Sequence, residues 1–264
     1  HKSDLYKIVI DCEDFELPYF TEKQVSIAKL LIKDYYHWHL VARKSHSAVY
    51  YSTRNFLSDA AIAKYGNVMY MKIDIAEVVQ LPAIQLLEAV STKKFFEALG
   101  GTISTLEYWA ANEKTKYSSG IVKFDVRAVK LMTNRENLLC CTTIYDKHEN
   151  KYLRIARSCN HVNYPASKNS IRTTTFIIDV IEAVSSVQSK FTRVILVNPK
   201  GMLEIGNNST PNALLQTGMK LLLGKKFADA VKKSVKARIA AKSFNDELAT
   251  IKSLNDNKKS KVSN

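Results

Sequence analysis

The scarcity of glycine and proline is the feature that most constrains how this chain can fold. Eight glycines and five prolines occur among 264 residues, so few positions can interrupt regular backbone structure. Apolar residues make up 46% of the chain and charged residues 24%, which is typical of a globular protein with a buried core. We therefore expect a folded protein in which helices and strands dominate and long linkers are rare.

The amino-terminal portion carries both helix and strand patterns. Thr21 and Gln24 have the spacing of a capping box, which starts a helix. Gly66 follows a second helical stretch, where a left-handed residue commonly ends a helix. The expected elements here are a strand over residues 5–10, helices over 22–36 and 57–65, a strand over 69–75, and helical pieces between 82 and 112 that break at Gly100 and Gly101.

Strand patterns dominate after Gly120. One strand of the expected hairpin contains Arg157 in its apolar phase, so either this strand ends near Ala156 or the arginine lies at a functional edge. The expected elements are a strand over 122–131 with a bulge, a hairpin with arms 138–145 and 151–159, a helix over 173–188, and strands over 193–197 and 202–205.

These patterns predict an α+β fold, with a twisted antiparallel sheet, packed helices, a helical C-terminal segment and a flexible basic tail. An amphipathic helix over residues 225–242 would carry lysines on its outer face. The expected portions are a neutral α/β portion over 1–119, a basic antiparallel sheet over 120–210, a helical segment over 211–254 and a tail over 255–264, which could also form one continuous domain.

The net charge of +14 is distributed unevenly along the chain. Residues 1–100 carry no net charge, whereas residues 101–219 carry +6 and residues 220–264 carry +8. A basic carboxyl half indicates a polyanionic partner, with nucleic acid first and an anionic membrane surface second. The alternative is a basic surface that serves solubility alone.

Several functional classes lack their signatures. Four cysteines, two of them adjacent, make a poor disulfide framework and favour reduced thiols in a cytoplasmic protein, or in the host cytoplasm if the protein is viral. No segment has the apolar length of a membrane span, so we expect a soluble protein. The standard cofactor, hydrolase and zinc motifs are absent, and we expect neither a cofactor nor a metal ion. His37 and His39 are interpreted as ordinary residues.

Basic and aromatic residues interleave along the predicted strands. Cations neutralise phosphates and ring faces stack on unpaired bases, which together favour a non-enzymatic protein that binds single-stranded DNA or RNA, with DNA favoured. The alternative is that the tyrosines pack across strands and the basic residues solvate the sheet. The predicted nucleic-acid-binding residues are Lys123, Arg127, Lys130, Arg135, Tyr145, Lys147, Lys151, Tyr152, Arg154 and Arg157, with Lys232, Lys233 and Lys236 on the carboxyl-terminal helix.

The ending Lys258–Lys259–Ser260–Lys261 is similar to the basic tails of some single-stranded-DNA-binding proteins of tailed phages. The likeness covers about a dozen residues together with overall size and charge. It implies a replication or transcription accessory factor, and a contact between the tail and an RNA polymerase or replication protein.

Two other classes remain open. A metal-dependent nuclease would use Asp125 on a strand together with Glu149 and Lys151, although Glu149 falls in a turn. A scaffold or membrane-surface protein would place the amphipathic carboxyl-terminal helix on anionic lipid headgroups.

Overall fold

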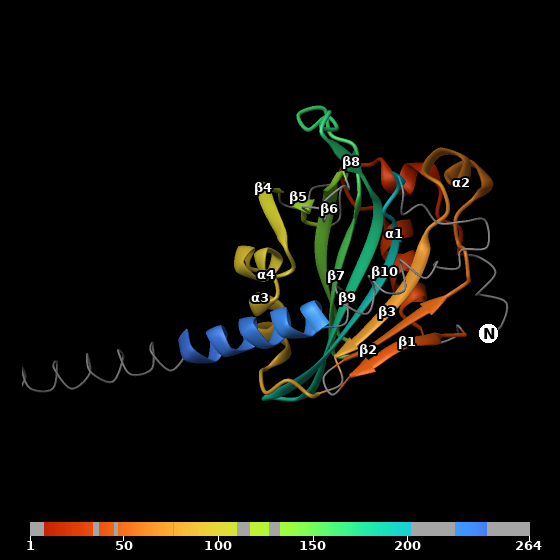
Figure 1. Cartoon of the computed structure of the whole chain (residues 1–264). Helices are drawn as coiled ribbons and strands as arrows, with labels where there is room; N and C mark the ends of the chain where they lie inside the picture. Colours follow the sequence, from red (N-terminus) through yellow and green to blue (C-terminus); the bar gives the residue numbers. More distant parts are fainter. Residues whose placement is uncertain are drawn as a thin grey trace, which may run out of the picture.

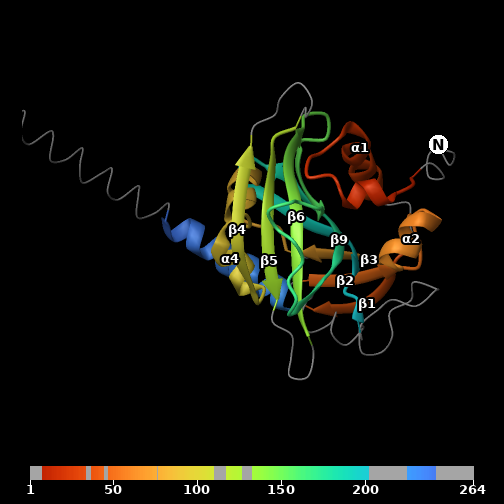
Figure 2. The same cartoon turned by 90° about the horizontal axis from the view of Figure 1, so that it is seen from above.

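The computed structural model describes residues 8–33, 37–44, 47–75, 77–109, 117–126, 133–201 and 225–241. The strands in this part of the chain are β1 (His39–Lys44), β2 (Ser47–Ser52), β3 (Met69–Ile75), β4 (Gly101–Trp109), β5 (Ser119–Val126), β6 (Asn134–Asp146), β7 (Lys151–Ser158), β8 (Ser170–Arg172), β9 (Thr174–Ser185) and β10 (Gln188–Asn198). They form one ten-stranded sheet in the order β1-β2-β3-β10-β9-β7-β6-β5-β4, with β8 parallel to β6. The predicted α+β class with a twisted antiparallel sheet is confirmed (Figure 2).

Helices cover both faces of this sheet (Figure 1). The described helices are η2 (Cys12–Phe15), α1 (Glu22–Leu31), α2 (Asp59–Tyr65), α3 (Ala83–Ala89), α4 (Lys93–Ala98) and residues 227–241, called here the carboxyl helix. We call the side covered by α1, η2 and α2 the α1 face, and the side covered by α3, α4 and the carboxyl helix the α3 face. Each face has its own apolar core.

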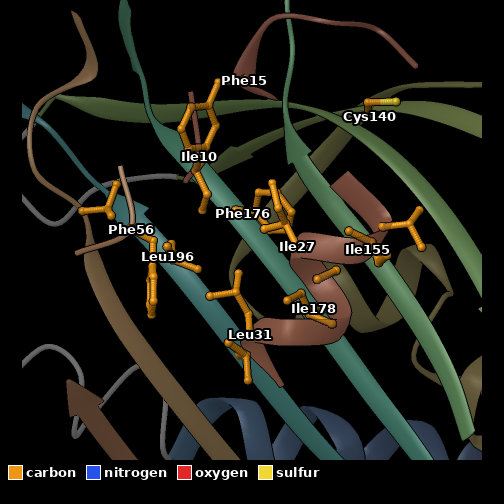
Figure 3. Packing of buried hydrophobic residues seen from close by; sticks show 14 of the residues in the cluster. Ile10, Phe15, Ile27, Leu31, Phe56, Cys140, Ile155, Phe176, Ile178 and Leu196 are labelled. Carbon is orange, nitrogen blue, oxygen red and sulfur yellow. The ribbon is translucent and has the colours of Figure 1, made fainter. Parts of the chain in front are cut away.

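The core of the α1 face forms between α1 and the central strands. Ile27 and Leu31 of α1 point toward Phe176, Ile178 and Leu196 of β9 and β10 (Figure 3). All five side chains are buried. Each one contributes about 1.5–3 kcal/mol through its removal from water.

The core of the α3 face uses the alternate residues of the same strands. Met71 of β3 and Phe191 of β10 lie buried against Leu86 of α3, Phe95 of α4 and Phe227 of the carboxyl helix. Because successive strand residues point to opposite faces, strands in the middle of the sheet need apolar residues in both phases. The central strands therefore read as nearly continuous apolar runs.

The predicted helix over residues 173–188 is wrong for this reason. The segment forms β9, which pairs with β10 along its whole length and with β7. Its apolar residues fit a helical period only because most positions are apolar. The β-branched side chains of Thr174, Thr175, Ile177, Ile178 and Val180 favour an extended backbone.

Local capping and turn signals were read correctly. In α1, Thr21 and Gln24 form the predicted capping box, and Gln24 Oε1 accepts a hydrogen bond of 2.8 Å from the Thr21 amide. Helix α2 ends at Gly66, whose φ is +78°. The predicted strand over 69–75 is β3, and the predicted hairpin is β6 and β7.

The predicted break at Gly100 and Gly101 separates a helix from a strand. Gly100 follows α4 with a φ of +88°. Gly101 begins β4, where a Cβ atom would lie 1.9 Å from the Phe124 ring, so a larger residue would force this ring to move. The prediction of helix beyond this break is wrong, because residues 101–109 pair with β5.

The predicted strand over 202–205 and the predicted basic tail over 255–264 lie outside the described residues. Within the part that is described, no helix combines the length and apolarity needed to cross a bilayer. All four cysteines are free. Strands from the neutral amino portion and from the basic portion belong to the same sheet.

Candidate functional site

Three charged side chains lie together in the apolar core of the α3 face. Asp179 of β9 is directly opposite Arg154 of β7 on one side and Arg193 of β10 on the other. Strand register alone therefore places both guanidinium groups beside one carboxylate. Only 1% of the Asp179 side chain is exposed to solvent. We call these three residues the Asp179 cluster.

Both arginines bind the carboxylate through more than one atom. Arg193 donates from Nε to Asp179 Oδ1 at 2.6 Å and from Nη2 to Oδ2 at 3.0 Å. Arg154 donates from Nε to Asp179 Oδ2 at 2.8 Å, and its Nη2 contacts the same oxygen. Charge-assisted bonds of this kind fix the planes of both guanidinium groups.

The electrostatics of the cluster keep Asp179 ionised. Burial, the largest influence, would raise the pKa of the Asp179 carboxyl group. The attraction of Arg193 and Arg154, together with their hydrogen bonds, outweighs burial and holds this pKa below its usual value. The cluster therefore carries two positive charges and one negative charge, which leaves one buried positive charge in excess.

The helices of the α3 face cover the cluster. Arg154 Nη1 donates to the Val90 carbonyl oxygen at 2.6 Å and to Ser91 Oγ at 2.7 Å, at the end of α3. The Arg193 guanidinium lies 4.6 Å from the ring centroid of Phe227 on the carboxyl helix. Among the described residues, Arg193 donates hydrogen bonds from Nε and Nη2 only, so Nη1 is available to an acceptor on a ligand.

The residues predicted to bind nucleic acid lie in several different environments. Arg157 is fully buried on the α1 face, where it donates to the Leu17 and Tyr19 carbonyl oxygens. Arg135 is buried and donates to the Pro199 and Lys200 carbonyl oxygens. Arg154 belongs to the Asp179 cluster. These three arginines have structural partners and are withdrawn from solvent.

The remaining predicted strand residues are paired or packed. Lys123 lies 3.4 Å from Glu136, and Lys151 pairs with Glu149. Tyr145 and Tyr152 face each other across the hairpin with ring centroids 4.8 Å apart, which is the cross-strand packing that was the alternative. Lys147 is exposed in the turn.

The predicted residues therefore do not form one cationic surface. Lys123, Lys151 and Arg157 point to the α1 face, whereas Arg135, Tyr145, Tyr152 and Arg154 point to the opposite face. On the carboxyl helix, Lys232 lies 3.9 Å from Glu77, while Lys233 and Lys236 are both exposed. Arg127 and Lys130 lie outside the described residues.

The acidic residues of the nuclease hypothesis are also far from a metal-binding arrangement. Asp125 accepts a hydrogen bond from Ser104 at 3.2 Å on β5, and Glu149 pairs with Lys151 in the β6–β7 turn. Across the described ranges, no group of three or more His, Cys, Asp or Glu side chains could hold a metal ion.

Sequence reasoning missed Asp179 and Arg193. A signal for both was available, since each is a lone charged residue in a strongly apolar segment, 176–181 and 191–197. A charge in a buried strand requires a partner. The assignment of β9 as a helix hid the register that makes these residues neighbours.

Comparisons of sequence find no relatives. No protein-family model matches the chain, and no curated protein sequence matches it. Comparison with solved structures gives a consistent result. Human STARD10 matches with a TM-score of 0.61 at 16% identity, over 86% of this chain and 83% of that chain.

Two further human structures show the same likeness. StAR-related lipid transfer protein 5 matches with a TM-score of 0.57 at 11% identity, over 83% of this chain and 99% of that chain. The StarD13 lipid transfer and protein localization domain matches with a TM-score of 0.55 at 13% identity, over 82% and 98%. At these identities the likeness establishes a shared START-like fold.

This fold overturns the nucleic-acid interpretation. The predicted binding of single-stranded DNA or RNA, the resemblance to phage proteins and the expected contact with an RNA polymerase or replication protein are wrong. The nuclease and the scaffold or membrane-surface alternatives are not supported either. The physical reason lies in the placement of the charges, because the strand cations point to opposite faces and many are bound to carboxylates or carbonyl oxygens. The comparison shows that this chain shares its fold class and sheet architecture with the StAR-related proteins.

Proposed function

We propose that this protein binds a single lipid-like molecule on the α3 face, between the sheet and the helices α3, α4 and 227–241. Two of the structures with the same fold are named for lipid transfer. The observation that carries the proposal is the Asp179 cluster, which places one excess positive charge inside an apolar layer. An amphipathic ligand matches both properties of this layer.

The Asp179 cluster provides a binding site for the polar head of such a ligand. A buried charge is costly unless a partner compensates it. Arg193 Nη1 is directed to no acceptor among the described residues, and a phosphate, carboxylate or hydroxyl oxygen of a lipid head would provide one. An anionic head would also neutralise the excess charge.

The apolar side chains of the α3 face provide contacts for the apolar part of the ligand. Met71, Ile73, Phe191, Leu86 and Val231 provide flexible and aromatic side chains from the sheet, α3 and the carboxyl helix. Methionine adapts to irregular apolar shapes at little cost. Acyl chains or a fused ring system would contact these side chains once the covering helices move apart.

A transfer assay tests this proposal. Delipidated protein is mixed with donor vesicles of phosphatidylcholine that contain a pyrene-labelled phospholipid or a pyrene-labelled fatty acid, and transfer to acceptor vesicles is followed by fluorescence. We expect transfer of at least one of the two probes. Arg193→Gln should reduce the transfer rate about tenfold, because it removes a charge-assisted hydrogen bond to the head while it leaves the neutral Arg154–Asp179 pair.

Arg157→Gln is the matched control. Arg157 is an equally large buried arginine, but it lies on the opposite face of the sheet. Its loss should lower stability and leave the transfer rate of the folded protein unchanged. Absence of transfer of either probe by the wild type, or an equal effect of the two substitutions at matched folded fraction, would contradict the proposal.

A further inference from the structure

A cavity lies on the α1 face, on the opposite side of the sheet from the Asp179 cluster. Its volume is about 580 Å³. The floor is formed by Val180 of β9 and by Thr192 and Val194 of β10, and Leu31 and Ile32 at the end of α1 form one side. Because strand residues alternate, Val180 and Thr192 follow Asp179 and precede Arg193 in the sequence yet face the opposite layer. We call this cavity the α1-end cleft.

The cleft exists because α1 is shorter than the strands that it covers. Helix α1 ends at Leu31 and buries Ile178 and Leu196 beneath it. Farther along these strands on the same face, Val180 and Thr192 are only half-buried. Trp38, which precedes β1, forms a further wall. The result is a concave site of the size that small molecules occupy in proteins.

Four lysines and three carboxylates line the cleft, and two of the carboxylates have partners. Asp74 accepts a hydrogen bond from Thr192 Oγ1 at 2.9 Å and lies 3.7 Å from Lys72. Glu149 pairs with Lys151. Glu182 lies directly opposite both Lys151 and Lys190 in the strand register.

Two of the lysines form no ion pair within the described part of the chain, although Lys190 lies opposite Glu182 in the strand register. Lys33, at the end of α1, and Lys190, on β10, form no ion pair with any residue in the described ranges, and they lie on the same cleft. Lys33 and Lys190 are both exposed, whereas Lys151 is half-buried and the pKa of its ammonium group is lowered, chiefly by burial. An anionic group at this edge of the cleft would lie in the field of these three ammonium groups.

We propose that the α1-end cleft binds a small amphipathic anion, namely an aromatic or short aliphatic group that carries one phosphate, sulfonate or carboxylate. The apolar part would contact Leu31, Val180 and Val194, and the anionic group would lie between Lys33 and Lys190. This site is separate from the lipid site proposed above, because the two occupy opposite faces of the sheet, and neither proposal requires the other.

The test uses the fluorescent sulfonate 8-anilinonaphthalene-1-sulfonate and its uncharged analogue N-phenyl-1-naphthylamine, each titrated into the full chain. The double substitution Lys33→Glu with Lys190→Glu should weaken sulfonate binding about tenfold and leave binding of the uncharged analogue unchanged. The matched control is Lys233→Glu with Lys236→Glu on the carboxyl helix, which changes the net charge equally and should leave both titrations unchanged.

Val180→Trp provides a second measurement, because the larger side chain fills the floor of the cleft. It should abolish sulfonate binding, whereas Arg193→Gln should have no effect on it. The proposal is overturned if the Lys33 and Lys190 reversal leaves the affinity unchanged, or if the carboxyl-helix control lowers it equally. It is also overturned if a saturating fatty acid displaces the sulfonate and Val180→Trp does not, since the probe would then occupy the α3 face. Melting curves of each variant establish that it is folded.

Discussion

Arg157 and the Asp179 cluster are buried in the same sheet, but they differ in the partners that compensate their charge. Arg157 donates to the backbone oxygens of Leu17 and Tyr19 and to Gln24 on the α1 face. Its guanidinium lies 4.7 Å from the Phe20 ring centroid. The arginines of the cluster bind a carboxylate on the α3 face. The first arrangement ties the amino-terminal segment to the sheet, and the second concentrates charge at a candidate binding layer.

The difference shows how one kind of residue can serve two purposes. Carbonyl oxygens accept hydrogen bonds from Nη1 and Nη2 of Arg157 at fixed positions, while its buried Nε has no hydrogen-bond partner among the described residues. A ligand could not displace these carbonyl oxygens without unfolding the segment around Leu17. In the Asp179 cluster, two guanidinium groups share one carboxylate. This leaves a net positive charge, which an anionic ligand could neutralise, and it leaves Arg193 Nη1 without an acceptor in the described ranges. Arg157 therefore stabilises the packing of the amino-terminal segment on the α1 face, whereas Arg193 is a candidate ligand-binding residue on the α3 face.

The largest effect is expected when the Asp179 cluster loses its carboxylate, which Arg157 does not depend on. Asp179→Asn should lower the free energy of unfolding by about 3–5 kcal/mol, because it leaves two buried guanidinium groups without a carboxylate. Chemical denaturation measures this loss. Arg154→Met should cost less, since it leaves one arginine and one aspartate. A larger loss of unfolding free energy in Arg154→Met than in Asp179→Asn would contradict the role given to the carboxylate.

A smaller effect is expected on the α1 face. Arg157→Met should lower the free energy of unfolding by about 2–3 kcal/mol, because two buried carbonyl oxygens lose their donors while no charge is left unpaired. Hydrogen exchange should quicken in residues 12–24 and remain unchanged around α3. Equal acceleration near α3 would show that the two faces are not independent.

The dependence of stability on pH gives the smallest and most selective difference. The pKa of Asp179 is lowered in the folded protein, so its contribution is present above the unfolded pKa of about 4 and is lost as the pH falls through the folded value. Asp179→Asn should therefore flatten the stability profile below pH 4, whereas Arg157→Met should lower the curve without changing its slope. Parallel profiles for wild type and Asp179→Asn would contradict the ionised cluster.

Prediction from sequence succeeded where a few neighbouring residues decide the structure. The capping box of Thr21 and Gln24, the end of α2 at Gly66 and the β6–β7 hairpin all depend on local hydrogen bonds and backbone preferences. It failed for β9, because a strand that is buried on both faces has an apolar pattern that also fits a helix. The sequence shows the anomalous phase of Arg157, but the carbonyl partners of this residue lie about 140 residues away in the chain.

The sequence by itself determined the α+β class, the excess of positive charge toward the carboxyl end and some local signals, such as the capping box of Thr21 and the helix end at Gly66, since these follow from composition and from neighbouring residues. The tertiary structure alone decided where each charge lies. Strand pairing brought Arg154 and Arg193 to Asp179 and sent Arg157 to the other face, and a change of one residue in register would have reversed these placements. Because the effect of a charge depends on its partners and its distance from water, the function could be proposed only from the folded chain.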